Sequence, residues 1–337
     1  MPLVTVLMPV YNGEAHIRES IDSILHQTWK DFELLIINDG SVDATDTIIN
    51  TYKDKRIVYL SHQQNRGLVT ILNEGLALAK GEYVARMDHD DIALPLRLEK
   101  QVDFLQKHPE IDLVGSNFLN ISLNACSELP TENDAIQIYQ LERPAFSHPS
   151  VMLRKSSLSK HRLQYNKESL HAEDYRLWID MSLKGLKLAN LKDVLINYRI
   201  HNEQISSKYN LDQEKISNDL KWYYLSNALP GISSKYKQPY LALINQSIDI
   251  ASVYFQSKKV VQLILEKNKA VHHFHHPHLE QFLHSRLQNT AKALYSKRCK
   301  PGFINLLQVL KDDFFYEYNR ENRPEKPIWR NLVRLYV

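Results

Sequence analysis

The sequence predicts an α/β fold in which a mainly parallel sheet carries helices on both faces and is followed by a helical C-terminal region. Two observations carry this prediction. In the N-terminal part, short apolar runs rich in β-branched residues alternate with amphipathic segments, a pattern typical of parallel sheets covered on both faces. Beyond residue 210 the strand-like runs stop and helical periodicity takes over. We therefore expect two domains, residues 1–210 and residues 211–337.

Each element follows from a local pattern. Strands are predicted where apolar, β-rich runs end in polar or turn residues, at 3–8, 32–38, 57–61, 83–87 and 113–116. Helices are predicted where apolar residues recur at helical spacing, at 14–28, after Ser41, at 67–79 and from Pro95 onward. Farther along we expect a short strand at 151–154, a helix that opens at 172–175 and a β-rich run at 194–200.

Composition favours a folded protein in a reducing compartment. Of the 337 residues, 43% are apolar and 24% are charged, which is not a disordered composition. The two cysteines are far apart and imply no disulfide framework. Residues 1–5 lack the start of a signal peptide, and no apolar run approaches the roughly 20 residues of a spanning helix. We expect a cytoplasmic protein without a transmembrane segment.

Charge is unevenly distributed along the chain, whose net charge is only +3. Residues 1–210 carry 23 Lys and Arg against 28 Asp and Glu, whereas residues 211–337 carry 19 against 11. Such asymmetry suggests that the two parts have separate roles. A basic C-terminal part suits contact with anionic lipid or nucleic acid, and the alternative is a helical surface that faces water.

The stretch that carries most chemistry is Asp88-His89-Asp90-Asp91, with three carboxylates at the end of the apolar run 83–87. In open α/β sheets, ligands bind at the carboxyl ends of the strands. Crowded carboxylates repel one another unless a cation or hydrogen-bond donors offset their charge. A hard divalent cation, held by carboxylates and phosphate oxygens, does this, so the stretch predicts a metal–diphosphate site. The alternative is an acidic turn before the helix near Pro95.

Six short motifs lie in a fixed order along the first part of the chain. They are MPVYN at 8–12, NDGS at 38–41, NRG at 65–67, RMDHDD at 86–91, AEDY at 172–175 and YRIH at 198–201. Together they resemble bacterial family-2 glycosyltransferases of the Rossmann-like GT-A fold, over about residues 1–205. The similarity is to enzymes that extend lipooligosaccharide, capsule or O-antigen chains with galactose, glucose or an N-acetylhexosamine. It implies a UDP-sugar donor and an oligosaccharide acceptor.

The resemblance places Pro9, Tyr11 and Asp39 around the uracil base of the donor. The residue types suit this role, because Tyr11 can stack on a pyrimidine and Asp39 can accept from its N–H. The alternative is a turn tyrosine and a helix-capping acid. By the same resemblance, Arg66 lies in the donor site and Asp91 contacts hydroxyl groups of the donor sugar.

Metal binding is expected at the acidic stretch. The resemblance makes Asp90 a ligand of Mn²⁺ or Mg²⁺ and gives Asp88 contacts with the ribose or the metal. His201 is a further candidate ligand, since a neutral imidazole suits manganese better than magnesium. The alternative for His201 is a hydrogen-bonded histidine at a strand end. His89 departs from the small residue common at its place in the family, so the detailed coordination depends on where its ring points.

Asp174 is the expected catalytic base. Inverting transfer needs one carboxylate that takes the proton of the acceptor hydroxyl as its oxygen attacks. The diphosphate leaves from the opposite face with its charge held by the metal, so a single displacement forms a β-glycosidic bond. The resemblance places the base at the aspartate of the Glu173-Asp174 pair, with Glu173 as its rival. The alternative is that both acids only favour a helix start.

Contacts with the acceptor and the membrane complete the expectation. His148 belongs to a His-Pro pair that resembles one near the acceptor in the family, and Trp178 is expected on the same side. The aromatic and basic stretch 312–337 suits a membrane interface, so we expect a lipid-linked acceptor at the inner face of the cytoplasmic membrane. The stretch can instead pack on the first domain or on a second copy in a homo-oligomer.

A histidine cluster at 272–278 holds five histidines in seven residues. We do not expect it to bind a physiological metal, because no cysteine or acid joins it at structural-zinc spacing and a proline interrupts it. A polar or pH-sensitive loop is the simpler interpretation.

Other classes of function fit parts of the sequence. A sugar-phosphate nucleotidyltransferase also uses acidic metal ligands, but residues 8–15 hold one glycine and no Lys or Arg for its phosphate loop. A dinucleotide-dependent oxidoreductase needs G-x-G-x-x-G after the first strand, and the sequence lacks it. A non-catalytic membrane or nucleic-acid binder would use the basic C-terminal part. The sequence carries no RNA-binding signature, so we expect no nucleic-acid partner.

Overall fold

The computed structural model describes residues 1–200, 210–247 and 251–295, and the chain divides into two compact units between residues 227 and 228. The sequence placed the boundary after residue 210. The difference is helix α9 (Asn210–Ala228), nearly all of which belongs to the first unit.

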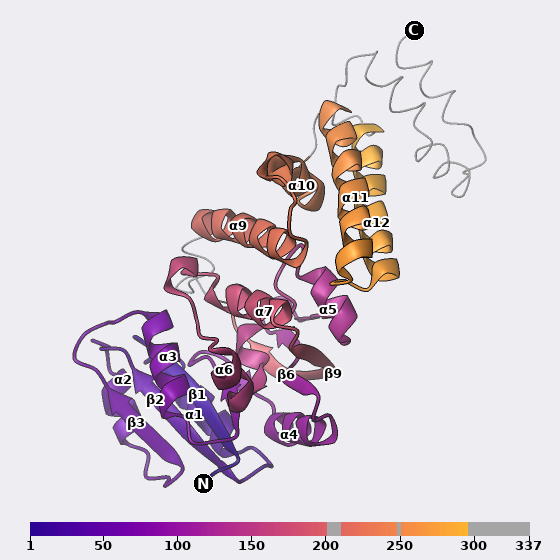
Figure 1. Ribbon diagram of the computed structural model, residues 1–337. Coiled ribbons are helices and arrows are strands. Elements are labelled where there is room, and N and C mark those ends of the chain that lie inside the picture. Colours follow the sequence, from indigo (N-terminus) through magenta and orange to yellow (C-terminus); the bar gives the residue numbers. More distant parts are fainter. Residues whose placement is uncertain (201–209, 248–250, 296–337) are drawn as a thin grey trace. The chain divides into compact units, whose positions relative to one another are not determined.

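In its described residues, the first unit is built on one nine-stranded mixed sheet (Figure 1). Its strands are β1 (Val4–Val10), β2 (Phe32–Asn38), β3 (Ile57–Ser61), β4 (Tyr83–Arg86), β5 (Ile92–Ala93), β6 (Ile111–Asn120), β7 (Ala125–Cys126), β8 (Met152–Arg154) and β9 (Lys187–Tyr198). Their order across the sheet is β3-β2-β1-β4-β8-β6-β9-β5, and β7 pairs with β6 off this path. The predicted strands 32–38 and 57–61 are confirmed residue for residue.

The expectation of a mainly parallel sheet is confirmed, and short antiparallel strands complete the mixed sheet. Strands β3, β2, β1 and β4 are parallel, and β6 is parallel to β9. Strand β8 is antiparallel to both β4 and β6, and β5 is antiparallel to β9. Strands β8 and β5 are only two or three residues long, and side-chain periodicity indicates the face on which a residue lies but not the direction of its strand.

Helices cover both faces of the sheet, as predicted. Along β1, Val6 and Met8 join one apolar core, and Leu7 between them joins the other, because successive strand residues point to opposite faces. The helices of the first unit are α1 (Ile17–Leu25), α2 (Thr45–Asn50), α3 (Leu68–Leu78), α4 (Arg97–Lys107), α5 (Asn133–Tyr139), α6 (Lys155–His161), α7 (Glu173–Leu183) and α9, with 3-10 turns η1 (His148–Ser150) and η2 (Lys167–Ser169). Helices α1, α2 and α4 pack on the first core, and α3, α6 and α7 pack on the second.

Helix α3 lies directly against β1 (Figure 1). A Cβ atom added at Gly75 would lie 2.2 Å from Cδ1 of Leu7, far inside van der Waals contact. Glycine at this position therefore lets the helix approach the strand whose carboxyl end forms part of the candidate site.

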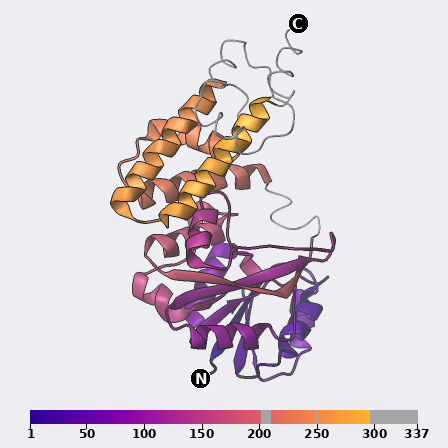
Figure 2. The same ribbon diagram turned by 90° about the vertical axis from the view of Figure 1, so that its right-hand side faces the viewer.

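The second unit is helical in its described part, as predicted. It contains α10 (Lys237–Ile244), α11 (Ala251–Val271), α12 (His276–Tyr295) and the 3-10 turn η3 (Ser234–Tyr236). Helices α11 and α12 lie side by side in both ribbon views (Figures 1 and 2). Within the described residues, no helix combines the length and apolar character needed to cross a membrane.

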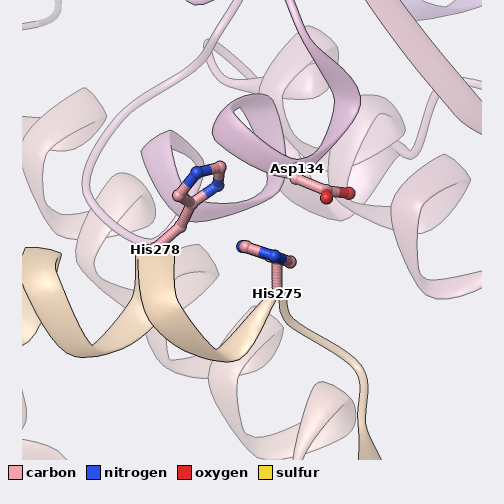
Figure 3. Close-up of side chains that lie close together, drawn as sticks. All are labelled: Asp134, His275 and His278. Carbon is pink, nitrogen blue, oxygen red and sulfur yellow. The ribbon is translucent and has the colours of Figure 1, made fainter.

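The histidine cluster connects α11 to α12 with residues 272–275 and begins α12 with residues 276–278. The Asn268 side chain donates to the carbonyl of Phe274 and accepts from its N–H, each at 2.9 Å, and so closes this turn. The rings of His275 and His278 have centroids 4.3 Å apart (Figure 3). The segment thus has a structural role as a helix-to-helix turn.

Candidate active site

A cavity of about 420 Å³ opens at the carboxyl ends of β1, β2 and β4 in the first unit. Among the residues that line it are eight that the sequence predicted for the site: Pro9, Tyr11, Asp39, Asp88, Asp90, His148, Glu173 and Asp174. Parallel strands bring their carboxyl ends to one edge, which explains why segments far apart in the sequence meet here.

Asp39 lies in one wall of the cavity and holds a neighbouring loop in place. One carboxylate oxygen of Asp39 accepts the backbone N–H of Arg66 at 2.7 Å, and the other accepts that of Gly67 at 2.9 Å. The Asp39 side chain therefore fixes the loop that opens α3. Tyr11 lies on the same side with 44% of its surface exposed.

Arg66 differs from its predicted place in the donor site. Its side chain turns toward Glu74, with Nη1 2.8 Å from Oε2, and does not line the cavity. The neighbouring residues Asn65 and Gly67 line the cavity instead. The backbone of the loop, held by Asp39, is therefore the part of this motif that faces the site.

Asp88, Asp90 and Asp91, which we call the acidic cluster, form the floor of the cavity and the layer beneath it. Each offers a carboxylate oxygen, and these oxygens all lie within 4.8 Å of one another. Asp88 forms an ion pair with the buried Arg86. Carboxylate oxygens at this spacing are the ligands that Mn²⁺ and Mg²⁺ prefer, so the cluster fits a divalent cation.

Asp91 lies beneath the cavity and does not line it, and its contact with the donor sugar stays a prediction. It is completely buried, and its Oδ1 accepts the backbone N–H of Arg199 at 2.9 Å. Its Oδ2 has no hydrogen-bond partner among the described residues. Burial, followed by the charges of Asp88 and Asp90, raises the pKa of Asp91 to about 8. An unpartnered buried oxygen beside two further carboxylates also fits a cation.

The acidic cluster is held in place from two sides. The Ser20 hydroxyl lies 2.7 Å from the carbonyl oxygens of both His89 and Asp91. The Arg199 guanidinium donates from Nε to the carbonyl of Asp90 at 2.9 Å and pairs with Glu19. Helix α1 and the end of β9 thus fix the backbone that carries the three acids.

Asp174 and Glu173 line the cavity from the first turn of α7. Burial, and then the neighbouring charge of Glu173, raises the pKa of Asp174 to about 7. Glu173 is only 5% exposed, burial raises its pKa too, and its Oε2 has no hydrogen-bond partner in the described chain. Both acids predicted for catalysis therefore line the cavity, and Asp174 can change protonation state near neutral pH.

His148 lines the cavity next to these acids, on the turn η1. Its Nε2 lies 2.9 Å from the Tyr165 hydroxyl. Burial, with a smaller effect of the Arg86 charge, lowers the pKa of His148 well below its ordinary value. The imidazole is therefore neutral at physiological pH and serves as a hydrogen-bonding group in the wall.

The contact of Trp178 with the acceptor stays a prediction, and in this structure its side chain packs behind the wall of the cavity. Trp178 is completely buried and does not line the cavity. Its ring packs edge-on against Phe146 and His148, with centroids 5.7 Å and 6.1 Å away. It supports the wall of the site from the apolar core. The predicted metal ligand His201 lies outside the described residues.

Sequence reasoning assigned no role to two side chains that the structure brings to the cavity, Arg86 and Gln213. Arg86 is 4% exposed and lines the floor. A single arginine inside an otherwise apolar strand was the signal that could have found it. Gln213 of α9 lines the cavity and donates to the carbonyl of His171 at 2.9 Å. No local pattern marks Gln213, because it lies beyond the last of the six motifs.

Comparison with known proteins places these features in context. The model of the family described as glycosyl transferase family 2 matches residues 5–160. A Haemophilus influenzae protein described as an uncharacterized glycosyltransferase is 35% identical over 285 residues, which are 78% of this chain and 84% of the relative. A second one so described, MJ1057 of Methanocaldococcus jannaschii, is 36% identical over 210 residues, or 60% of this chain and 72% of the relative.

Solved structures share the fold at low sequence identity. TarS of S. aureus in complex with UDP-GlcNAc has a TM-score of 0.58 and 18% identity, and the match covers 88% of this chain and 91% of that one. The mannosyltransferase PcManGT of Pyrobaculum calidifontis, in complex with GDP-Man and Mn²⁺, has a TM-score of 0.53 and 16% identity, with 88% of each chain covered.

Proposed function

The chain belongs to glycosyl transferase family 2 and has the GT-A fold, and on this premise we propose that it moves a hexose or an N-acetylhexosamine from a UDP-sugar to a hydroxyl group of a growing surface glycan. The proposed donors carry galactose, N-acetylgalactosamine, glucose or N-acetylglucosamine, and the proposed acceptor is lipooligosaccharide, O-antigen or capsule. One observation supports the proposal most strongly. A single cavity joins Tyr11 and Asp39, the acidic cluster and Asp174.

Donor binding is proposed to begin with the nucleotide. The exposed ring of Tyr11 offers a face on which a pyrimidine can stack. The Asp39 carboxylate orders the loop at 65–67 and keeps lone pairs for the N–H of uracil, since each oxygen can accept more than one hydrogen bond. TarS and PcManGT were solved with nucleotide sugars, which supports a donor of this class.

The proposed cofactor is Mn²⁺ or Mg²⁺, held by Asp88 and Asp90. The hard oxygen ligands of the acidic cluster and the orphaned Oδ2 of Asp91 support this choice. When bound, such a cation offsets the negative charge of the leaving diphosphate. Ser20 and Arg199 hold the backbone of the cluster, so its carboxylates are already oriented before the donor binds.

Asp174 is proposed as the base. In its ionised form, the carboxylate accepts the proton of an acceptor hydroxyl, while that oxygen attacks the anomeric carbon of the donor sugar. The bond from the anomeric carbon to the UDP oxygen breaks on the opposite face, and UDP leaves with the bonding electron pair. A single displacement inverts the configuration, so an α-linked UDP-sugar yields a β-glycosidic product. The pKa of Asp174, about 7 because of burial and Glu173, suits a base that works near neutral pH.

We further propose that the acceptor is lipid-linked and that the enzyme works in the cytoplasm, peripherally on the inner face of the cytoplasmic membrane. The support comes from sequence, in the aromatic and basic stretch 312–337, which lies outside the described residues. Deletion of this stretch is expected to lower binding to anionic vesicles more than turnover of a soluble acceptor. Equal losses in both assays would contradict the membrane role.

The experiment that tests the function is UDP release from the four UDP-sugars, measured with Mn²⁺ and with EDTA. Wild type is compared with Asp90→Ala, Asp174→Asn and the control Asp103→Asn, which changes an exposed acid of α4 paired with Lys107. We expect turnover of one or two donors, loss of turnover in EDTA and in both site variants, and no change in the control.

Measurements of UDP binding distinguish the role of Asp174 from that of Asp90. Asp174→Asn is expected to bind UDP as wild type does, because the change leaves the nucleotide side intact, whereas Asp90→Ala is expected to lose metal-dependent UDP binding. A wild type that binds no UDP-sugar, or turnover that ignores both EDTA and the two substitutions, would overturn the proposal.

A further inference from the structure

Arg86 is a buried, positively charged residue in the floor of the cavity. The reaction proposed above does not assign it a role. Arg86 ends β4, and its strand neighbour Ala85 belongs to the core beneath α1 and α4. Because side chains alternate along a strand, Arg86 points to the opposite face, the one covered by α3 and α7. There it is 4% exposed and lines the cavity. A guanidinium in such a place needs partners, since burial of an unpaired charge is costly.

The partners of Arg86 account for only part of its hydrogen-bonding capacity. Its Nη1 pairs with Asp88 of the acidic cluster. Its Nε is buried and has no hydrogen-bond partner among the described residues. A buried N–H without an acceptor is rare in folded proteins and costs free energy. A ligand oxygen in the cavity would supply the missing hydrogen-bond acceptor.

The surroundings of Arg86 show which part of a ligand it faces. Its positive charge acts on Glu173, Asp174 and His148, which are the groups of the base side. Its ion pair, in contrast, is with Asp88 on the donor side. Arg86 therefore shares one cavity with the acids that would hold the diphosphate and with the acid that would accept the proton. In a displacement reaction, the group between these two positions is the sugar that moves.

We propose that the Arg86 guanidinium binds the transferred sugar itself, by donating N–H groups to its hydroxyl oxygens, and thereby selects an intact nucleotide sugar over free nucleotide. This inference rests on the proposed function. The ion pair with Asp88 holds the planar guanidinium in position, so little side-chain freedom is lost when the sugar binds. Charge-assisted hydrogen bonds of this kind are stronger than those between neutral groups.

The test compares dissociation constants for UDP and for the four UDP-sugars, by calorimetry in Mn²⁺, for wild type, Arg86→Lys and Arg86→Gln. We expect UDP binding to change less than threefold, and the advantage of the preferred UDP-sugar over UDP to fall about tenfold or more, as the loss of a charge-assisted hydrogen bond implies. The control is Arg154→Gln in the neighbouring strand β8. Arg154 donates from Nε to the carbonyl of Ile111 at 2.8 Å and does not line the cavity.

Two results would overturn the inference while leaving the proposed function intact. Parallel losses for UDP and UDP-sugars would mean that Arg86 only neutralises Asp88, and unchanged ratios would mean that it does not contact the sugar. A wild type that binds neither UDP nor any UDP-sugar would instead refute the proposed function. Arg86→Lys keeps the positive charge beside Asp88, so it retains the fold if Arg86→Gln does not.

A second measurement changes the donor and compares its binding to wild type and to Arg86→Lys. Wild type is titrated with analogues of the preferred donor that lack one hydroxyl at a time. We expect one analogue to bind about tenfold more weakly than the parent donor, and this penalty to shrink in Arg86→Lys. An equal loss of affinity in both proteins would show that another residue binds that hydroxyl group.

Discussion

The completely buried Arg97 donates a 2.6 Å hydrogen bond from Nη2 to the carbonyl oxygen of Arg86, at the point where β4 ends and the acidic cluster begins. Its Nε also donates to the side chain of Gln101, one helical turn farther along α4. Burial, followed by the charge of Arg86, lowers the pKa of Arg97 to about 9, so it stays charged at neutral pH. Arg97 thus fixes the end of the strand from beneath the sheet.

Replacement of Arg97 by Met, which is apolar and flexible enough to fill the space, is expected to destabilise the protein. The change leaves the Arg86 carbonyl and the Gln101 side chain without their donors, and the loss should be about 2–4 kcal/mol in the free energy of unfolding. Thermal melting followed by tryptophan fluorescence measures it. Arg143→Met is the matched control, because Arg143 is 59% exposed and pairs with Glu142 at the surface. Equal melting temperatures for the two variants would contradict this role of Arg97.

Asp39→Asn is expected to weaken UDP binding about tenfold or more. One carboxylate oxygen becomes an NH₂ group, which must then face a backbone N–H of Arg66 or Gly67, so the loop loses an anchor. Isothermal titration with UDP measures the effect. Asp54→Asn is a matched control, since Asp54 accepts the backbone N–H of Arg56 at 2.9 Å but does not line the cavity. Comparable losses in both variants would assign the effect to general stability.

Much of the site could be predicted because its signals are local. The ends of β2 and β4 are marked by abrupt changes from apolar to acidic residues, and the rule for parallel strands then brings Asp39 and Asp88 to one edge. The Glu173-Asp174 pair is likewise a local mark at a helix start. The sequence also predicted both layers of helices, since amphipathic periodicity depends only on neighbouring residues.

The rest depends on contacts between segments far apart in the sequence. Asp91 accepts a hydrogen bond from the backbone N–H of Arg199, 108 residues away, and no sequence pattern near Asp91 predicts this contact. Trp178 follows Asp174 by four residues and shares its helix face, but one turn along the helix that face already lies in the core. The direction of β8 could not be predicted either, because side chains alternate along a strand in the same way whichever direction the strand runs.

Turnover is expected to rise with pH around neutrality. Asp174 must be ionised to accept a proton, and burial together with the Glu173 charge raises its pKa to about 7, so kcat/KM at saturating Mn²⁺ should reach half its maximum near pH 7. Glu173→Gln removes the neighbouring negative charge, so the midpoint of the profile should move to lower pH with activity retained. If Glu173 is itself the base, the same substitution abolishes activity at every pH, which separates the two assignments.

Asp174→Asn is expected to stabilise the protein while it abolishes turnover, and the gain should be larger at pH 8 than at pH 5. The ordinary pKa of an aspartate is 3.8, and burial raises that of Asp174 to about 7 in the folded protein. Between these two values the folded state holds a proton that the unfolded state has released, so stability falls as pH rises through this range. The side chain of asparagine does not titrate in this pH range. The difference in melting temperature between variant and wild type should therefore grow as pH rises.

Asp103→Asn, at an exposed ion pair with Lys107, should change little at either pH. A difference that is the same at pH 5 and pH 8 would show that the carboxylate of Asp174 is well solvated, and the basis for its activity near neutral pH would have to be sought elsewhere in the cavity.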